Sequence, residues 1–147
     1  MLSLQEITDL IKGFPADDYE PAQQACGKLV AAGPKTIEAL ILMAGSKFGD
    51  KEGVQPKYAV HALASYVCRP GAEKERQMFA ETLAGQLDGD NSDDLKAFII
   101  RQLQLCGREQ EVPALAKTLK AEALKETTVQ ALTAIGGNAA DKALSGV

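Results

Sequence analysis

Glycine ends a helical pattern at four spaced positions in the chain: Gly33, Gly71, Gly107 and Gly136. The intervals between them are 38, 36 and 29 residues. Glycine is favoured just after a helix because it reaches backbone conformations that other residues rarely adopt. Intervals of this length are typical of helical-hairpin repeats, in which each unit is one antiparallel pair of helices. The 147-residue chain therefore has room for about four such pairs.

Between these breaks the apolar residues recur with the spacing of an amphipathic helix. No segment shows the period-2 alternation or the hairpin turns of β-strands. The composition agrees, because alanine and leucine carry the apolar content, tryptophan is absent and only 5% of residues are aromatic. The sequence thus predicts an all-α fold. Helices are expected at residues 3–12, 18–32, 35–47, 55–68, 72–87, 93–106, 108–119, 124–135 and 139–145.

Pro113 lies within one of these helical stretches, although proline disrupts helix interiors. The first backbone N–H groups of a helix have no partner inside the helix, so a proline near the start loses little. Gly107 ends the preceding helix only a few residues earlier. Pro113 is therefore expected near the start of the second helix of a repeat.

The segment Val112-Pro113-Ala114-Leu115, followed by Leu119, is similar to the start of the second helix in the HEAT-repeat superfamily. In particular, the chain resembles the bacterial HEAT-like repeats that are also found in phycobilisome lyases. Ala140–Leu144 keeps the outline without the proline, and Gly33-Pro34 shifts the proline into the turn. The resemblance covers roughly residues 16 to 147, after a leading helix at 3–14. It implies an armadillo-like α-solenoid, a right-handed superhelix, with repeats at about 16–50, 51–90, 91–121 and 122–147.

Repeats of this kind stack into one continuous core and need a polar cap at each end. The leading helix Ser3–Lys12 has the polar face of a cap, whereas the last expected helix is barely two turns long. We therefore expect the chain to be a piece of a longer protein, with a short natural terminus as the alternative.

The net charge of −4 and the isoelectric point near 5.0 disfavour binding to nucleic acid. The charge is spread evenly along the chain, so neither half is basic. Residues 1–6 lack the pattern of a signal peptide, and the longest apolar run is too short to cross a bilayer. A cytoplasmic location with no membrane association is the expectation.

No pattern in the sequence predicts a catalytic, cofactor or metal site. The single histidine, His61, has no nucleophile or acid near it in sequence. The three cysteines Cys26, Cys68 and Cys106 stand far apart, so they predict neither a disulfide framework nor a zinc site. All three are expected to be buried as small apolar residues.

The sequence favours a non-enzymatic scaffold module that binds another protein along a concave face. The second helices of such repeats usually line that face. The alternative is a HEAT-like enzyme, such as a bilin lyase or a DNA glycosylase-like protein. The partner and the oligomeric state stay open. The residues expected to contact a partner are Lys35, Glu38, Lys74, Arg76, Glu81, Glu111, Lys117 and Lys120.

Overall fold

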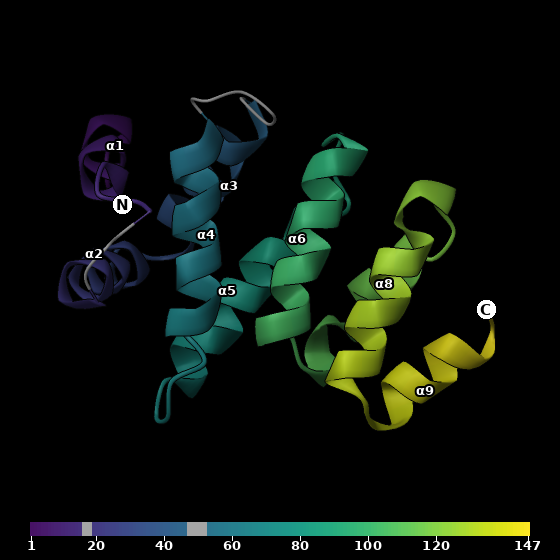
Figure 1. Cartoon of the computed structure of the whole chain (residues 1–147). Coiled ribbons are helices and arrows are strands. Elements are labelled where there is room, and N and C mark those ends of the chain that lie inside the picture. Colours follow the sequence, from purple (N-terminus) through teal and green to yellow (C-terminus); the bar gives the residue numbers. More distant parts are fainter. Residues whose placement is uncertain (16–18, 47–52) are drawn as a thin grey trace. The chain divides into compact units, whose positions relative to one another are not determined.

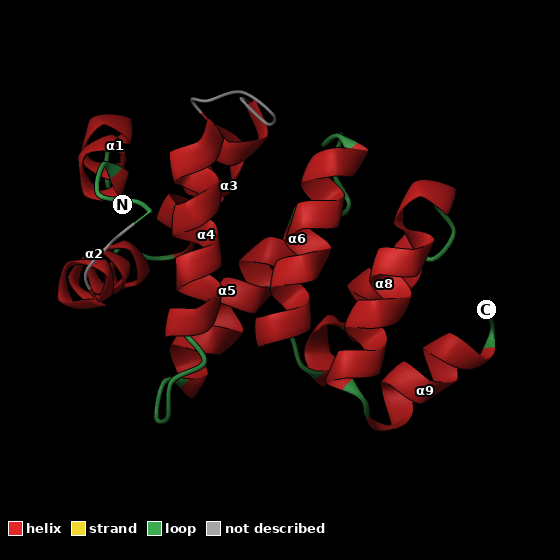
Figure 2. Ribbon diagram, in the orientation of Figure 1, coloured by secondary structure: helices red, strands yellow, loops and turns green. Residues whose placement is uncertain are grey.

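The computed structural model describes residues 1–15, 19–46 and 53–147. Within these residues every regular element is a helix and none is a strand, which confirms the all-α prediction (Figure 2). The helix start expected at Asp18 and the helix end expected at Lys47 lie outside the described residues. The expected boundary between the first two repeats, at residues 50 and 51, lies outside them too.

The helices follow one another with short connections and match the predicted segments closely (Figure 1). A short 3-10 turn, η2 (Glu109–Glu111), precedes α7. The helices are α1 (Leu4–Ile11), α2 (Tyr19–Ala31), α3 (Pro34–Ser46), α4 (Val54–Tyr66), α5 (Glu73–Gly85), α6 (Asp93–Cys106), α7 (Val112–Thr118), α8 (Glu122–Ile135) and α9 (Gly137–Ser145).

The chain divides into two compact units, Met1–Phe79 and Ala80–Val147. The division falls inside α5. We call them the N-terminal unit and the C-terminal unit and describe each by itself.

In the N-terminal unit, α2 packs against both α3 and α4, and α3 packs against α4. The leading helix α1 contacts all three. Figure 1 shows α2 nearly end-on and α4 from the side, so the two helices cross at a steep angle. The core includes the fully buried Ile7, Leu29, Ile37 and Leu63. Burying a side chain of this size contributes about 1.5–3 kcal/mol to stability.

Two long-range hydrogen bonds hold α1 in the N-terminal unit. The backbone N–H of Leu2 donates to Oγ1 of the buried Thr36 on α3, at 3.0 Å. The side-chain amide of Gln55 at the start of α4 donates to the carbonyl of Lys12, at 3.1 Å. Both ends of α1 are thus attached to later helices.

In the C-terminal unit, α6 and α8 lie side by side (Figure 1), and α7 packs against α8 and α9. Ile99, Leu103 and Leu132 are among the fully buried side chains there. The hydroxyls of Thr118 and Thr128 lie 2.6 Å apart in the interior and join α7 to α8. Thr118 also donates to the Leu115 carbonyl at 2.7 Å, so Thr128 is the donor between the two hydroxyls.

Local sequence signals set several helix ends. Ser3 and Glu6 form a capping box at α1, and the Ser92 hydroxyl caps α6 by accepting from the Leu95 N–H at 3.2 Å. Pro113 lies in the first turn of α7, as predicted, and Pro34 is the first residue of α3.

The four junction glycines differ in conformation. Gly33, Gly71 and Gly136 have positive φ, whereas Gly107 has a φ of −73°. The four glycines therefore share a place in the sequence pattern but not one backbone conformation.

Among the described residues, no single helix is long and apolar enough to cross a membrane. Taken together, α2 and α3 have that length and composition, but a bend of 117° separates them.

Candidate functional site

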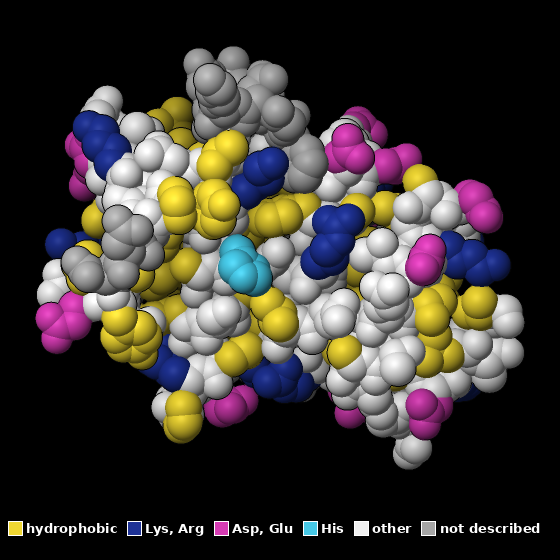
Figure 3. Space-filling view, in the orientation of Figure 1, with side chains coloured by type: hydrophobic (Ala, Val, Ile, Leu, Met, Phe, Trp, Pro, Cys, Tyr) yellow, Lys and Arg dark blue, Asp and Glu magenta, His cyan; other side chains and the backbone are white. Residues whose placement is uncertain are grey.

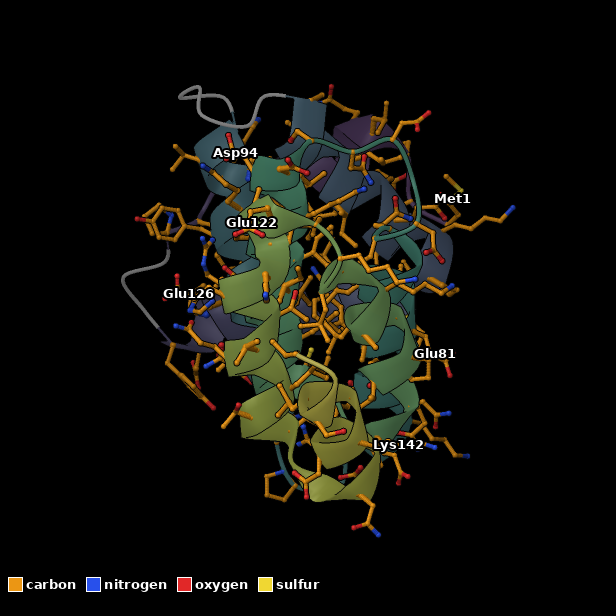
Figure 4. The ribbon with its side chains drawn as sticks, turned by 90° about the vertical axis from the view of Figure 1, so that its right-hand side faces the viewer. Met1, Glu81, Asp94, Glu122, Glu126 and Lys142 are labelled. Atoms are coloured by element: carbon orange, nitrogen blue, oxygen red, sulfur yellow. The ribbon has the colours of Figure 1, made fainter. Side chains whose placement is uncertain are left out.

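Six of the eight expected contact residues are exposed, and they come from three helices and one helix end. Glu81 is labelled in Figure 4, on α5. The exposed residues are Lys35 and Glu38 on α3, Lys74 and Glu81 on α5, Lys117 on α7, and Lys120 just after α7.

Arg76 and Glu111, also expected at the surface, are instead buried, with 6% and 2% of their surfaces exposed. Glu111 turns back to accept the N–H of Arg108 at 2.9 Å, which caps the turn before α7. Arg76 donates through Nε to Glu73 at 3.4 Å, one helical turn away. Both side chains are therefore occupied inside the fold, and neither offers a partner much surface.

Lys35 and Glu38 lie together on one exposed stripe of α3. They line a shallow hollow of about 410 Å³ with Ala39, Leu42 and Met1. We call it the α3 hollow. Positions 35, 38, 39 and 42 have the spacing of one helix face, and the opposite face of α3 is buried. Two oppositely charged side chains thus flank an apolar floor.

Met1 and Leu42 were not among the expected contact residues, although both are exposed, at 81% and 44%. The Leu2–Thr36 hydrogen bond holds the N-terminal segment against α3 and so places Met1 beside the hollow. A signal for Leu42 was present in the sequence, because α3 is apolar nearly all round. Such a helix is enclosed by its neighbours or covered by a partner.

A second hollow, of about 550 Å³, lies between α1 and the end of α2. We call it the α1–α2 groove. Leucine and alanine side chains form its apolar part, while two carboxylates line it from α1 and one lysine from α2. The lining residues are Leu2, Glu6, Asp9, Leu10, Lys28, Ala31 and Ala32.

The carboxylate of Asp9 in this groove is held in its charged form. Hydrogen bonds from Lys12 and then from Gln5 lower the pKa of Asp9, and the Lys12 ammonium lies 3.1 Å from Oδ1. Asp9 is therefore ionised at neutral pH.

The loop between α4 and α5 carries a polar cluster that we call the Arg69 clasp: Tyr66, Arg69 and Glu75. Arg69 lies 3.8 Å from the centre of the Tyr66 ring and donates to both oxygens of Glu75, at 2.8 and 2.9 Å. It also donates to the Tyr66 carbonyl at 2.8 Å. The hydrogen bond to Glu75 raises the pKa of Arg69, so the guanidinium stays charged. These contacts of Arg69 hold the loop between α4 and α5 in place.

The cysteine near this clasp is unsuited to nucleophilic chemistry. Burial raises the pKa of Cys26 to about 11, although the charge of Arg69 acts in the opposite direction. A thiol with this pKa is protonated at neutral pH, whereas the thiolate is the reactive form. Cys106 is buried as expected, but Cys68, two residues after the end of α4, is exposed, so the expectation was wrong for Cys68.

His61 lies at the surface of α4, where it is drawn cyan in Figure 3. Over the described part of the chain, no three His, Cys, Asp or Glu side chains come together as a metal ion would require.

Two groups of exposed charges in the C-terminal unit are candidates for a site: the pair Lys117–Asp88 and the charges of α8. Lys117 lies 3.7 Å from Asp88, and both side chains are mostly exposed. On α8, Glu122 and Glu126 lie one turn apart (Figure 4) and share a surface with Lys125. Only α8 contributes to that surface, so it has no second wall to hold a ligand.

Comparison with protein-family models gave no match for this chain, and comparison with curated proteins gave none either.

Proposed function

We propose that this protein is a non-enzymatic interaction module that binds a protein partner through its second helices, with the α3 hollow as the main contact. One observation carries the proposal: α3 leaves Leu42 exposed, beside Met1, Lys35 and Glu38, on a helix that is apolar nearly all round. An apolar floor with a few charges at its edge is the composition of a binding patch.

The proposed architecture is an α-solenoid of HEAT-like repeats. Contacts between corresponding helices of successive pairs support it. In the N-terminal unit, α2 packs on α4; in the C-terminal unit, α6 packs on α8 and α7 on α9. Repeats that cannot bury their apolar faces alone pack in this way. Solenoids commonly present extended surfaces for partners, and this links the architecture to the function.

The test exchanges the two charges of the α3 hollow. In Lys35→Glu/Glu38→Lys the net charge and the one-turn spacing stay the same, but the charge pattern that a partner meets is reversed. Tagged wild-type and variant chains are used to capture proteins from the lysate of the source organism, and capture is compared by mass spectrometry. A partner bound through the hollow is retained by the wild type and lost from the variant.

The matched control is Glu122→Lys/Lys125→Glu on α8, which exchanges a pair that is also exposed and has the same spacing. It should capture the partner as well as the wild type does. Equal capture by all three chains would refute the α3 hollow as the contact. Two other outcomes would favour the enzyme alternatives over the interaction module. Binding to DNA that weakens steeply as salt rises would favour a DNA glycosylase-like protein, and a shifted absorbance band on adding a bilin would favour a bilin lyase.

A further inference from the structure

Exposed large apolar side chains of the described chain include four within residues 1–46, besides Tyr58, Leu105 and Val147. Met1, Leu4 and Leu42 are 81%, 64% and 44% exposed, and Tyr19 at the start of α2 is exposed as well. Scattered single apolar residues are normal on a protein surface, whereas a group of them marks an interface. Of these residues, Met1 and Leu42 line the α3 hollow.

The α3 hollow and the α1–α2 groove are neighbours in the N-terminal unit. Met1 lines the first and Leu2 lines the second, so consecutive residues form parts of both walls. The hydrogen bond from Leu2 to Thr36 fixes this segment in place. The two hollows therefore adjoin the same N-terminal segment.

The charges of the two hollows are complementary. The α3 hollow carries Lys35 and Glu38, one turn apart. The groove carries carboxylates on α1, including the ionised Asp9, and Lys28 on α2. Lys35 of one molecule can therefore face the α1 carboxylates of another, while Glu38 faces Lys28. The apolar floors meet between these pairs.

We infer that the partner at the α3 hollow is a second copy of this chain, with the α3 hollow of each copy set against the α1–α2 groove of the other. Such an arrangement closes about a two-fold axis, because each copy supplies both surfaces. This inference rests on the proposed function of the α3 hollow and names its partner.

The oligomeric state of the wild-type chain is the first measurement. Sedimentation equilibrium over roughly 10 µM to 1 mM covers the affinities of weak and moderate dimers. We expect a reversible monomer–dimer equilibrium that weakens as salt rises, since exposed charges contribute to it. A chain that stays monomeric at the highest concentration overturns the inference.

Two charge-exchange variants identify the surfaces. Lys35→Glu/Glu38→Lys changes the α3 hollow, and Asp9→Lys/Lys28→Glu changes the groove while leaving the capping residue Glu6 intact. Each should weaken dimerisation at least about tenfold, because both contacts of a dimer become mismatched. The α8 exchange Glu122→Lys/Lys125→Glu should leave dimerisation unchanged.

Mixing the two variants provides the decisive comparison. In a heterodimer the changed hollow meets the changed groove, and the two unchanged surfaces meet each other, so complementarity returns at both contacts. One variant is labelled with ¹⁵N, and native mass spectrometry measures the masses of the species in the mixture. We expect a heterodimer of intermediate mass at concentrations at which each variant alone is monomeric. A mixture that stays monomeric contradicts the pairing.

A groove-filling substitution tests the apolar part separately. Ala31 is exposed and lines the groove, so Ala31→Phe should fill it and weaken the dimer without disturbing the core. Ala134→Phe, at an exposed position of α8, is the matched control. A dimer that tolerates Ala31→Phe overturns the inference.

Failure of this inference can be told apart from failure of the proposed function. If the chain is monomeric but Lys35→Glu/Glu38→Lys still abolishes capture of another protein, the α3 hollow binds a different partner. If neither dimerisation nor capture depends on these charges, both proposals fail.

Discussion

Two glycines of the same sequence pattern, Gly71 and Gly107, are needed at their helix junctions for different physical reasons. Gly71 has a φ of +85°, and an added Cβ atom would have nothing within 4 Å. Gly107 has an ordinary φ of −73°, but an added Cβ atom would lie 2.6 Å from the Leu103 carbonyl oxygen and 3.2 Å from Cδ1 of Ile135. The first needs glycine for backbone conformation, the second for space.

The contacts that hold the two junctions in place also differ. Next to Gly71 the loop is held by the polar contacts of the Arg69 clasp, in a partly exposed position. Next to Gly107 the chain lies among buried residues, with Cys106 on one side and Val112 on the other. Polar contacts add to this packing, because Arg108 donates to the Gly107 carbonyl at 2.7 Å and to Glu111 at 2.9 Å. Polar contacts thus hold both junctions, but only at Gly107 does close contact with neighbouring atoms leave no room for a Cβ atom.

The largest expected effect is that of Gly107→Ala. The new methyl group collides with backbone that cannot move aside easily, so the free energy of unfolding should fall by about 1–3 kcal/mol. Urea unfolding of both chains measures the difference. Gly107→Asn should cost no less than Gly107→Ala, because the collision is made by the Cβ atom. A stability equal to that of the wild type would show that the junction relaxes.

A smaller loss, of about 1 kcal/mol, is expected for Gly71→Ala, from the positive φ. Here Gly71→Asn should be milder than Gly71→Ala, because asparagine tolerates the left-handed region better. The sharpest test of the comparison is whether alanine or asparagine lowers stability more at Gly71, compared with the same two substitutions at Gly107. If the two positions gave the same order, the proposed difference between them would be refuted.

Neutralising the clasp should have a still smaller effect. Glu75→Gln removes the charged pair with Arg69, and a partly exposed pair contributes about 1 kcal/mol or less. The loss should shrink in high salt, which is checked by thermal unfolding at two salt concentrations. Asp88→Asn, which removes the looser pair with Lys117 at 3.7 Å, serves as the control and should change almost nothing. A larger loss for the control would reverse the ranking of the two pairs.

The cysteines distinguish the two junctions by reactivity rather than by stability. At pH 8, Cys68 should react with a thiol reagent at once, because it is exposed. Cys26 should stay unmodified, because it is buried and its pKa is about 11. Cys106, also buried, should become accessible only on unfolding. Mass spectrometry of the labelled peptides gives the order, and early labelling of Cys26 would contradict the burial described for it.

The helix ends were predictable because capping depends on a few neighbouring residues. Ser3, Ser92 and Pro113 each act within one turn, so their roles could be predicted from the local sequence. The difference between Gly71 and Gly107 could not, because it depends on the backbone conformation of each junction and, at Gly107, also on Ile135, which is distant in the sequence.

The exposure of a candidate residue could be predicted only where the pattern of a single helix determines it. Lys35 and Glu38 lie opposite the buried face of α3, and the sequence pattern places them there. Arg76 and Glu111 resembled ordinary solvated charges, yet the fold encloses them. The α1–α2 groove depends on residues from two helices, so no single stretch of sequence predicts it.

The hydrogen bond between Leu2 and Thr36 makes the second residue of the chain a reporter of folding. A backbone amide so near a chain end usually exchanges its hydrogen with solvent almost at once. Here its acceptor is the side chain of the buried Thr36, so exchange with deuterium requires the segment around Leu2 to detach from α3. The exchange rate of the Leu2 amide thus reports how often this segment detaches from α3.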